Sequence, residues 1–337
     1  DEKFLKSWLK KKISITTSTV VSFLITGAIG GGTAYGVNNP GTGGNDAVAI
    51  GTGSTTTGDG VAVGANANAT SATSGGVTSK GVAIGNDAKA KGSVSVGDSA
   101  SSNYFGVAVG YKAGAENTTT GFSYSNVTIG SNTRVGVQGT QASQGIAIGS
   151  GVLADQGAWA KGDQSISIGG NTIASGDSSI AIGGDDLRAV STKTSSYSDA
   201  KFDKNGNKIG GNSNNTASIN NIFNTLTGRG AILHGGTGTD GTKYAQWRNT
   251  ESGQGGVALG VKSLSGDIAL AIGTFSEATG TNSVAIGTGA QTPQSGAVSI
   301  GGGSTTYGLQ GRQITDADIT LTDGTTMALT NFAGASG

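Results

Sequence analysis

The tetrapeptide Val284-Ala285-Ile286-Gly287 carries the pattern that decides the fold, because variants of it occur thirteen times along the chain. Each copy reads aliphatic, small, aliphatic, glycine, and the glycines stand at positions 51, 64, 85, 97, 110, 130, 149, 169, 183, 260, 273, 287 and 301. Successive glycines lie 12 to 14 residues apart in seven steps and 19 to 21 apart in four, and one step spans 77 residues. Such a period indicates a solenoid of short repeats.

The alternation inside each copy predicts a short β-strand. Side chains alternate along a strand, so the two aliphatic residues share one face and the small residue takes the other. β-Branched residues suit the extended backbone, and the glycine permits the bend that follows. A step of about 13 residues fits a coil of two strands and two turns, and the longer steps add a surface loop. We expect the aliphatic pairs to line the inside of the coils, with the small residues on the opposite face.

One coil cannot fold alone. Two buried aliphatic side chains contribute ~3–6 kcal/mol, whereas ordering a coil of this length costs on the order of 20 kcal/mol. Stacked neighbours must supply ladder hydrogen bonds and a continuous core. Because each core is thin, we also expect coils from several chains to pack together. A glycine-rich β-sandwich is the alternative, and the nearly constant spacing favours the solenoid.

The composition limits the possible functions. The chain has 63 Gly, no Cys, one His and 5% aromatic residues, and its 21 basic and 21 acidic residues balance. Balanced charge offers no basis for nucleic-acid binding, and the absence of Cys excludes disulfides and thiolate metal sites. A catalytic triad with histidine would depend on His234, which stands in a Gly-rich stretch without a nucleophile motif. We predict a protein that is not an enzyme and has no cofactor and no metal.

Residues 1–36 form a separate unit. Lys10, Lys11 and Lys12 precede an uncharged, mostly apolar stretch over 13–29, and small residues follow over 30–34. This order is typical of an export signal. A membrane-anchor helix is the alternative, but Ser, Thr and Gly dilute the apolar stretch. We therefore predict an exported protein.

Residues 184–256 interrupt the repeats. Within them Ile219, Ile222, Phe223 and Leu226 are spaced as on one face of a short helix. The segment is either a protruding insert that meets a receptor or a connector that packs on the side of the solenoid. Loops on a rigid scaffold commonly carry binding residues. The partner-binding candidates in this segment are Tyr197, Tyr244, Trp247 and Arg248.

Shorter loops supply the remaining partner-binding candidates. Tyr104 and Phe105 precede one copy of the repeat, and Tyr111 follows it. Exposed aromatic side chains often anchor protein interfaces. The alternative is that these three rings cover the flank of the solenoid.

The repeat resembles the head repeat of trimeric autotransporter adhesins of the YadA type. Asn282-Ser283-Val284-Ala285-Ile286-Gly287 matches the family pattern residue for residue, and the resemblance covers roughly residues 45–183 and 253–303. It implies an all-β fold, a left-handed parallel β-roll assembled as a homotrimer on the bacterial outer membrane. We accordingly assign residues 37–183 and 257–303 to the head.

Both ends of the chain resemble further parts of this family. The leader over 10–27 is similar to those of fusobacterial members, which implies receptors of the CEACAM family as candidate partners. Arg312-Gln313-Ile314-Thr315, within residues 304–337, is similar to the start of the family's neck. The family's coiled-coil stalk and membrane anchor are not visible, so we interpret the chain as part of a longer protein.

Two functional hypotheses follow. The first is an adhesin head that binds a host cell-surface glycoprotein or an extracellular-matrix protein through a rigid trimer. The second is a structural module for autoaggregation or biofilm formation, without a specific host receptor. A polysaccharide lyase would need longer coils and clustered charged residues, and this sequence has neither.

Overall fold

The computed structural model describes residues 47–115, 124–137, 142–227, 233, 248–306, 317–320 and 326–329, the last two ranges as backbone only. The chain divides into two compact units, one ending at Phe105 and the other beginning at Gly106. Each contains a parallel β-roll, which confirms the predicted all-β fold class. The predicted export signal, His234, Tyr244 and Trp247 lie outside the described residues.

In the first unit every coil contributes one strand to each of two parallel sheets. The motif sheet holds the repeat motif, and the return sheet holds the strand that leads back. The motif strands are β1 (Val48–Ile50), β3 (Val61–Val63), β7 (Val82–Ile84) and β9 (Val94–Val96). The return strands are β2 (Thr55–Thr56), β4 (Asn68–Thr70), β8 (Lys89–Lys91) and β10 (Ser101–Asn103). One long step holds an antiparallel hairpin of β5 (Ala72–Ser74) and β6 (Val77–Ser79), where the spacing predicted a surface loop.

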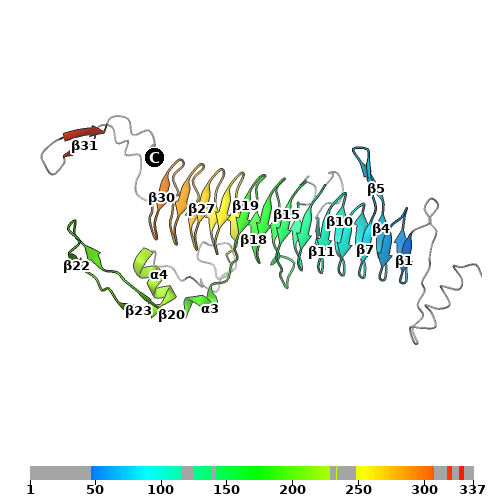
Figure 1. The fold of residues 1–337 in the computed structure, drawn as a ribbon, viewed down its shortest axis with the longest axis horizontal. Coiled ribbons are helices and arrows are strands. Elements are labelled where there is room, and N and C mark those ends of the chain that lie inside the picture. The colour runs from blue at the N-terminus through cyan, green and yellow to red at the C-terminus, as the bar shows by residue number, and fades with distance from the viewer. Residues whose placement is uncertain are drawn as a thin grey trace, which may run out of the picture. The chain divides into compact units, whose positions relative to one another are not determined.

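The second unit repeats this arrangement, and Figure 1 shows its strands as a row of stacked arrows. Its motif strands are β11 (Val107–Val109), β13 (Val127–Ile129), β15 (Ile146–Ile148), β17 (Ile166–Ile168), β19 (Ile180–Ile182), β25 (Val257–Leu259), β27 (Leu270–Ile272), β29 (Val284–Ile286) and β30 (Val298–Ile300). Its return strands are β12 (Gly114–Ala115), β14 (Arg134–Val135), β16 (Trp159–Ala160), β18 (Thr172–Ala174), β24 (Thr250–Ser252), β26 (Leu264–Ser265) and β28 (Glu277–Ala278).

The stacking is in register, so equivalent residues of successive motifs are neighbours. Ala285 pairs with Ala271 on one side and with Ser299 on the other, and Ile286 pairs with Ile272 in the same way. Each motif residue therefore belongs to a ladder of its own kind along the sheet. This regularity follows from the near-constant spacing of the motifs, which lets every coil offer the same backbone groups to the next.

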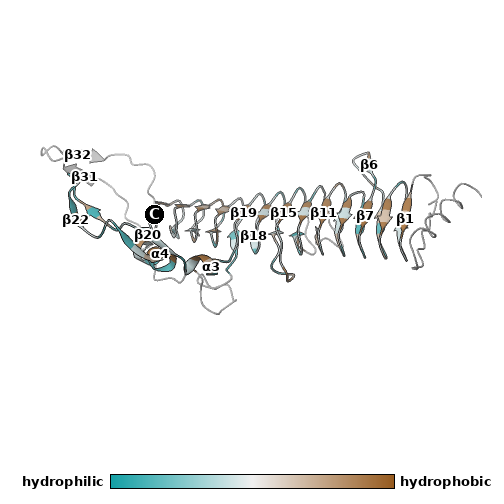
Figure 2. Cartoon of the chain, turned by 60° about the horizontal axis from the view of Figure 1, so that its bottom comes forward, coloured by the Kyte–Doolittle hydropathy of each residue, from teal (hydrophilic) through white to brown (hydrophobic). Residues whose placement is uncertain are grey.

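The interior of the roll is lined by the small residues, so the expectation that the aliphatic pairs line it is wrong. Ala271 and Ala285 are fully buried, whereas Val298 and Ile300 are 56% and 68% exposed. The interior is too thin for larger side chains, because hydroxyls on facing strands touch: Ser167 Oγ lies 2.8 Å from Thr172 Oγ1. In the described coils mostly Ala, Ser and Thr side chains lie between the two sheets, and Val135 is a larger exception. The aliphatic residues consequently point outward, and Figure 2 shows this hydrophobic colouring on motif strands such as β1 and β11.

The repeat glycine is required at the bend after each motif strand. Gly287 has φ +129°, a region that side chains other than hydrogen rarely allow. A Cβ at this position would lie 2.6 Å from the carbonyl carbon and oxygen of Gly301 in the next coil. The glycines thus permit both the turn and the close stacking of the coils.

The insert leaves the roll after Gly183 and returns earlier than the sequence predicted. It contains α3 (Arg188–Ser191), the pair β20 (Thr194–Tyr197) with β23 (Asn215–Ser218), the hairpin β21 (Lys201–Phe202) with β22 (Lys208–Gly210), and α4 (Ile219–Thr227). Helix α4 confirms the helical spacing found in the sequence. Thr250–Ser252 already pairs with β18 as strand β24, so the coils resume at Thr250 rather than at the predicted boundary of 257.

Near the end of the chain β31 (Ala317–Thr320) and β32 (Thr326–Leu329) form an antiparallel pair. The neck-like residues 312–315 lie outside the described residues. Within the described ranges, no helix is long and apolar enough to cross a membrane.

Candidate interaction surfaces

The outward side of the motif sheet forms a continuous apolar stripe, which we call the aliphatic face. In the second unit it consists of the first and third residues of every motif strand from β11 to β30, which point away from the interior. Val109, Ile129 and Ile182 are 37–40% exposed, and the strand β30 is more exposed still. The motif strands of the first unit present the same face, with Ile50 47% exposed. Soluble monomers rarely expose contiguous apolar patches of this kind, so the aliphatic face is a candidate interface.

The outward side of the return sheet mixes polar residues with Trp159, Ile173 and Leu264, and so differs from the aliphatic face. Trp159 lies there between two cations, with the Arg134 guanidinium 3.9 Å and the Lys161 ammonium 4.2 Å from its ring centroid. Its indole Nε1 donates a hydrogen bond of 2.7 Å to the carbonyl of Gly136. Trp159 is therefore held on the flank by its own neighbours, and this side of the roll is suited to solvent.

Helix α4 of the insert packs against the coils through a small aromatic core. Phe223 meets Phe275 of the β27–β28 turn edge to face, with ring centroids 5.6 Å apart. Leu187 and Leu233 complete the buried cluster, and Phe275 is fully buried. This part of the insert matches the connector alternative. The hairpin β21–β22 differs, because Phe202 and Ile209 on it are 58% and 67% exposed.

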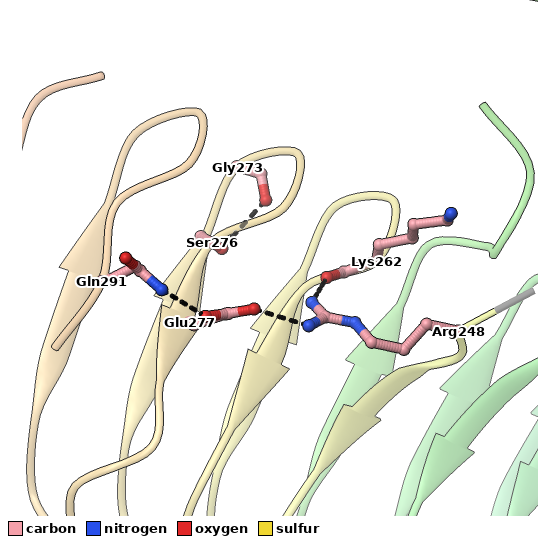
Figure 3. Close-up of polar contacts among 6 residues, drawn as sticks. All are labelled: Arg248, Lys262, Gly273, Ser276, Glu277 and Gln291. Atoms are coloured by element: carbon pink, nitrogen blue, oxygen red, sulfur yellow. Dashed lines mark hydrogen bonds and ion pairs between the residues drawn. The ribbon is translucent and has the colours of Figure 1, made fainter. Parts of the chain in front are cut away.

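A buried ion pair joins the end of the insert to the roll (Figure 3). Arg248 is 7% exposed and donates a hydrogen bond of 2.5 Å from Nη1 to Oε1 of Glu277, and another from Nη2 to the carbonyl of Lys262. Gln291 Nε2 donates to the other carboxylate oxygen of Glu277 at 2.7 Å. The Arg248 guanidinium also lies 4.7 Å from the ring centroid of Phe275. Arg248, a partner-binding candidate in the sequence, is thus a buried structural group rather than a surface residue.

Lys262 is the second buried cation of this junction. Its side chain is fully buried, and its ammonium donates a hydrogen bond of 2.9 Å to the carbonyl of Leu233 in the insert. Burial, and after it the positive charge of Arg248, lower the pKa of Lys262 to about 8. Burial raises the pKa of Asp185, and a hydrogen bond from the Asn171 side chain partly offsets this rise. The junction therefore holds several charges away from water.

The remaining partner-binding candidates lie at separate places. In the first unit Tyr104 is half-buried, with the Lys91 ammonium 4.7 Å from its ring centroid, and Phe105 is 37% exposed. In the second unit Tyr111 is 45% exposed with Lys112 near its ring, and Tyr197 is half-buried on β20. These positions do not test the prediction that the residues bind a partner.

Sequence reasoning missed Lys262 and Glu277. Both stand among Gly and Ser residues in the repeat, where a charged residue is expected to be solvated. The signal that they are buried lies in contacts with Leu233 and Arg248, which are 29 residues away from them in sequence. In the part of the chain that the structure describes, no group of three or more His, Asp or Glu residues could hold a metal ion.

Comparison with known proteins identifies the repeat. Residues 43–67, 160–185 and 265–290 match the family model of the YadA head domain repeat (2 copies). No curated protein matches the chain significantly. The chain therefore carries YadA-type head repeats, the module of surface-exposed trimeric autotransporter adhesins, a class that is in general not enzymatic.

Proposed function

We propose that the chain is the head of a bacterial surface adhesin whose three copies pack through their aliphatic faces. The trimer attaches the bacterium to a host cell-surface glycoprotein or an extracellular-matrix protein. The observation that supports this most is the aliphatic face itself, a ladder of Val, Leu and Ile that a single copy leaves uncovered. The match to YadA-type head repeats supports three copies and a place at the outer membrane, because such heads in general form homotrimers there.

The energetics of the coils favour such an assembly. The interior of one roll buries mainly alanine methyls and serine or threonine hydroxyls, which contribute little apolar area. The larger apolar side chains of the motif strands lie on the outside of the motif sheet. Covering a half-exposed Val or Ile side chain stabilises by roughly 1 kcal/mol, and the gain repeats at every coil. Packing copies through this face therefore completes a hydrophobic core that one chain lacks.

Attachment to the host then uses the threefold repetition of surface loops. Three equal sites on one rigid body multiply weak contacts through avidity. The insert and the loops at Tyr104, Phe105 and Tyr111 are the candidate contact regions. Receptors of the CEACAM family are the candidate partners, because the leader over 10–27 resembles those of fusobacterial members of the adhesin family.

The assembly is tested by the mass of the purified chain in solution. We expect the wild type to be a trimer and the double variant Ile272→Ser/Ile286→Ser to be a monomer at the same concentration. Leu264→Ser is the matched control, because Leu264 faces outward from the return sheet instead. A monomeric wild type, or a double variant that stays trimeric, would contradict the proposal.

Host attachment is tested by capture of host-cell surface proteins on immobilised protein. We expect the trimeric head to retain a host protein that the Ile272→Ser/Ile286→Ser variant retains at least tenfold more weakly, because the monomer loses avidity. Equal capture by both forms would contradict the avidity mechanism. A trimer that captures no host protein but clumps the bacteria that display it would favour self-association instead.

A further inference from the structure

A loop between β15 and β16 presents two adjacent aliphatic side chains to solvent. Val152 is 88% exposed, more than any other large apolar residue in the described ranges, and Leu153 is 58% exposed. A single exposed aliphatic residue needs no explanation. Two adjacent exposed aliphatic residues at the tip of an ordered loop do need an explanation.

Hydrogen bonds hold this loop, residues 150–157, in one shape. The buried side chain of Asn132 donates from Nδ2 to the carbonyls of Gly151 and Val152, at 2.9 and 3.2 Å. Gln156 closes the tip. Its side-chain Oε1 accepts a hydrogen bond from the backbone amide of Leu153, and its backbone amide donates one to the carbonyl of Leu153. The two apolar side chains are thus presented on a fixed backbone, so a partner can bind them with little ordering cost.

The loop borders the aliphatic face. It begins directly after Ile148 and Gly149, where the motif strand β15 ends and the chain bends toward the return sheet. The insert leaves the roll at the equivalent bend after Gly183. Hydrogen bonds connect the two, since the Asn171 amide donates to the Gln156 carbonyl and Asn171 Nδ2 donates to Asp185. A copy of the chain that covers the aliphatic face must therefore pass this edge of the roll.

We infer that loop 150–157 is a clamp between copies, in which Val152 and Leu153 pack against the neighbouring chain of the trimer. The inference rests on the proposed trimer and names a contact outside the aliphatic face. Continuity with that face favours a second copy as the occupant. A lipid surface is disfavoured by charge, because Asp155 is the charged residue of the loop and anionic headgroups repel it.

The contact is tested directly by photo-crosslinking in the full chain. Benzoylphenylalanine replaces Val152 in one protein and Ile173 in another, since Ile173 faces outward from the return sheet. On irradiation we expect chain-to-chain adducts that survive denaturation from position 152 and none from position 173. A trimeric protein that yields no such adduct at 152 would overturn this inference while leaving the proposed trimer intact. A monomeric wild type would overturn both.

A second measurement asks whether the contact matters for assembly. We expect the double variant Val152→Ser/Leu153→Ser to raise the concentration at which the trimer dissociates by at least tenfold. The control Val77→Ser changes a valine on the β5–β6 hairpin that is 60% exposed, close to the exposure of Leu153, and should leave that concentration unchanged. Trimers of unaltered stability that capture host proteins more weakly would overturn the clamp and assign the loop to the receptor.

Discussion

The coils and the insert of the second unit are held together in opposite ways. In the coils, the same few interactions repeat at every step: an in-register ladder, a buried Ala, Ser or Thr, and a glycine bend. In the insert, single contacts carry the structure, such as the Phe223–Phe275 pair and the Arg248–Glu277 ion pair. Repetition makes the coils independent of any one side chain's chemistry but sensitive to side-chain size. The insert, in contrast, depends on the chemistry of a few individual side chains.

The interiors of the two regions show the same difference. Within the coils, Ser283 Oγ donates to the carbonyl of Gly280 at 2.6 Å, so even polar residues there satisfy local backbone groups. At the insert, Lys262 and Arg248 bring charge into a buried site and need distant partners, the Leu233 carbonyl and Glu277. The coils therefore need only their neighbours, whereas the insert needs specific positions on the coils.

The largest effect is expected from a change in size within the coils. Gly287→Ala places a Cβ 2.6 Å from the Gly301 carbonyl, in a backbone conformation with φ +129°. Together the strain and the clash should cost about 4 kcal/mol. We expect the midpoint of thermal unfolding, followed by circular dichroism, to fall sharply.

The control for this change is Gly301→Ala. Gly301 has φ +113°, but a Cβ there meets nothing within 4 Å. The strain remains and the clash is absent, so the cost should be about 1–2 kcal/mol. If both variants unfold at the same midpoint, close stacking of coils is not what the glycines protect.

A change in charge should act at the junction with the insert. Glu277→Gln leaves the buried Arg248 without its carboxylate, which should cost about 3 kcal/mol. Glu251→Gln is the matched control on the same return-sheet ladder, because Glu251 is half-buried and accepts a hydrogen bond from the Ser175 hydroxyl. Denaturant unfolding should show the loss for Glu277 and less than about 1 kcal/mol for Glu251. Equal losses would mean that the ion pair does not hold the insert.

The coils could be predicted from the sequence because their determinants are local. The spacing of the motif glycines fixes the coil length, and the alternation within Val284-Ala285-Ile286 fixes which side chains share a face. Alternation alone does not say which face is interior. That depends on the gap between the sheets, which admits Ala285 and excludes Ile286, and the gap appears only when the return strand is placed.

The insert was predictable only in part for the same physical reason. Helix α4 follows from the spacing of Ile219, Ile222, Phe223 and Leu226, a local pattern. The partners of Arg248 and Lys262 are set by how the insert meets the coils, and the sequence gives no spacing rule for that contact. The aromatic residues proposed to bind a partner had the same difficulty, because exposure depends on tertiary placement.

The smallest predicted effect is a pH dependence of the junction that originates at Lys262. Its pKa is about 8 in the folded protein and 10.5 as the ordinary value. Between these values the unfolded chain holds the proton and the folded chain does not, so the free energy of unfolding rises with pH across this window. The neutral amine still donates to the Leu233 carbonyl, so deprotonation removes the cost of burying a charge without removing the contact.

From pH 7 to pH 9 this difference should stabilise the wild type by about 1 kcal/mol. Other lysines and tyrosines titrate in the same range, so the wild type must be compared with Lys262→Met, which keeps the buried chain length without the charge. Denaturant unfolding at a series of pH values gives the free energy of unfolding of both proteins. From pH 7 to pH 9 this free energy should rise by about 1 kcal/mol more in the wild type than in the variant. Parallel slopes of this free energy against pH would show that Lys262 is solvated in the folded protein, and Arg248 would then be the buried cation on which the insert depends.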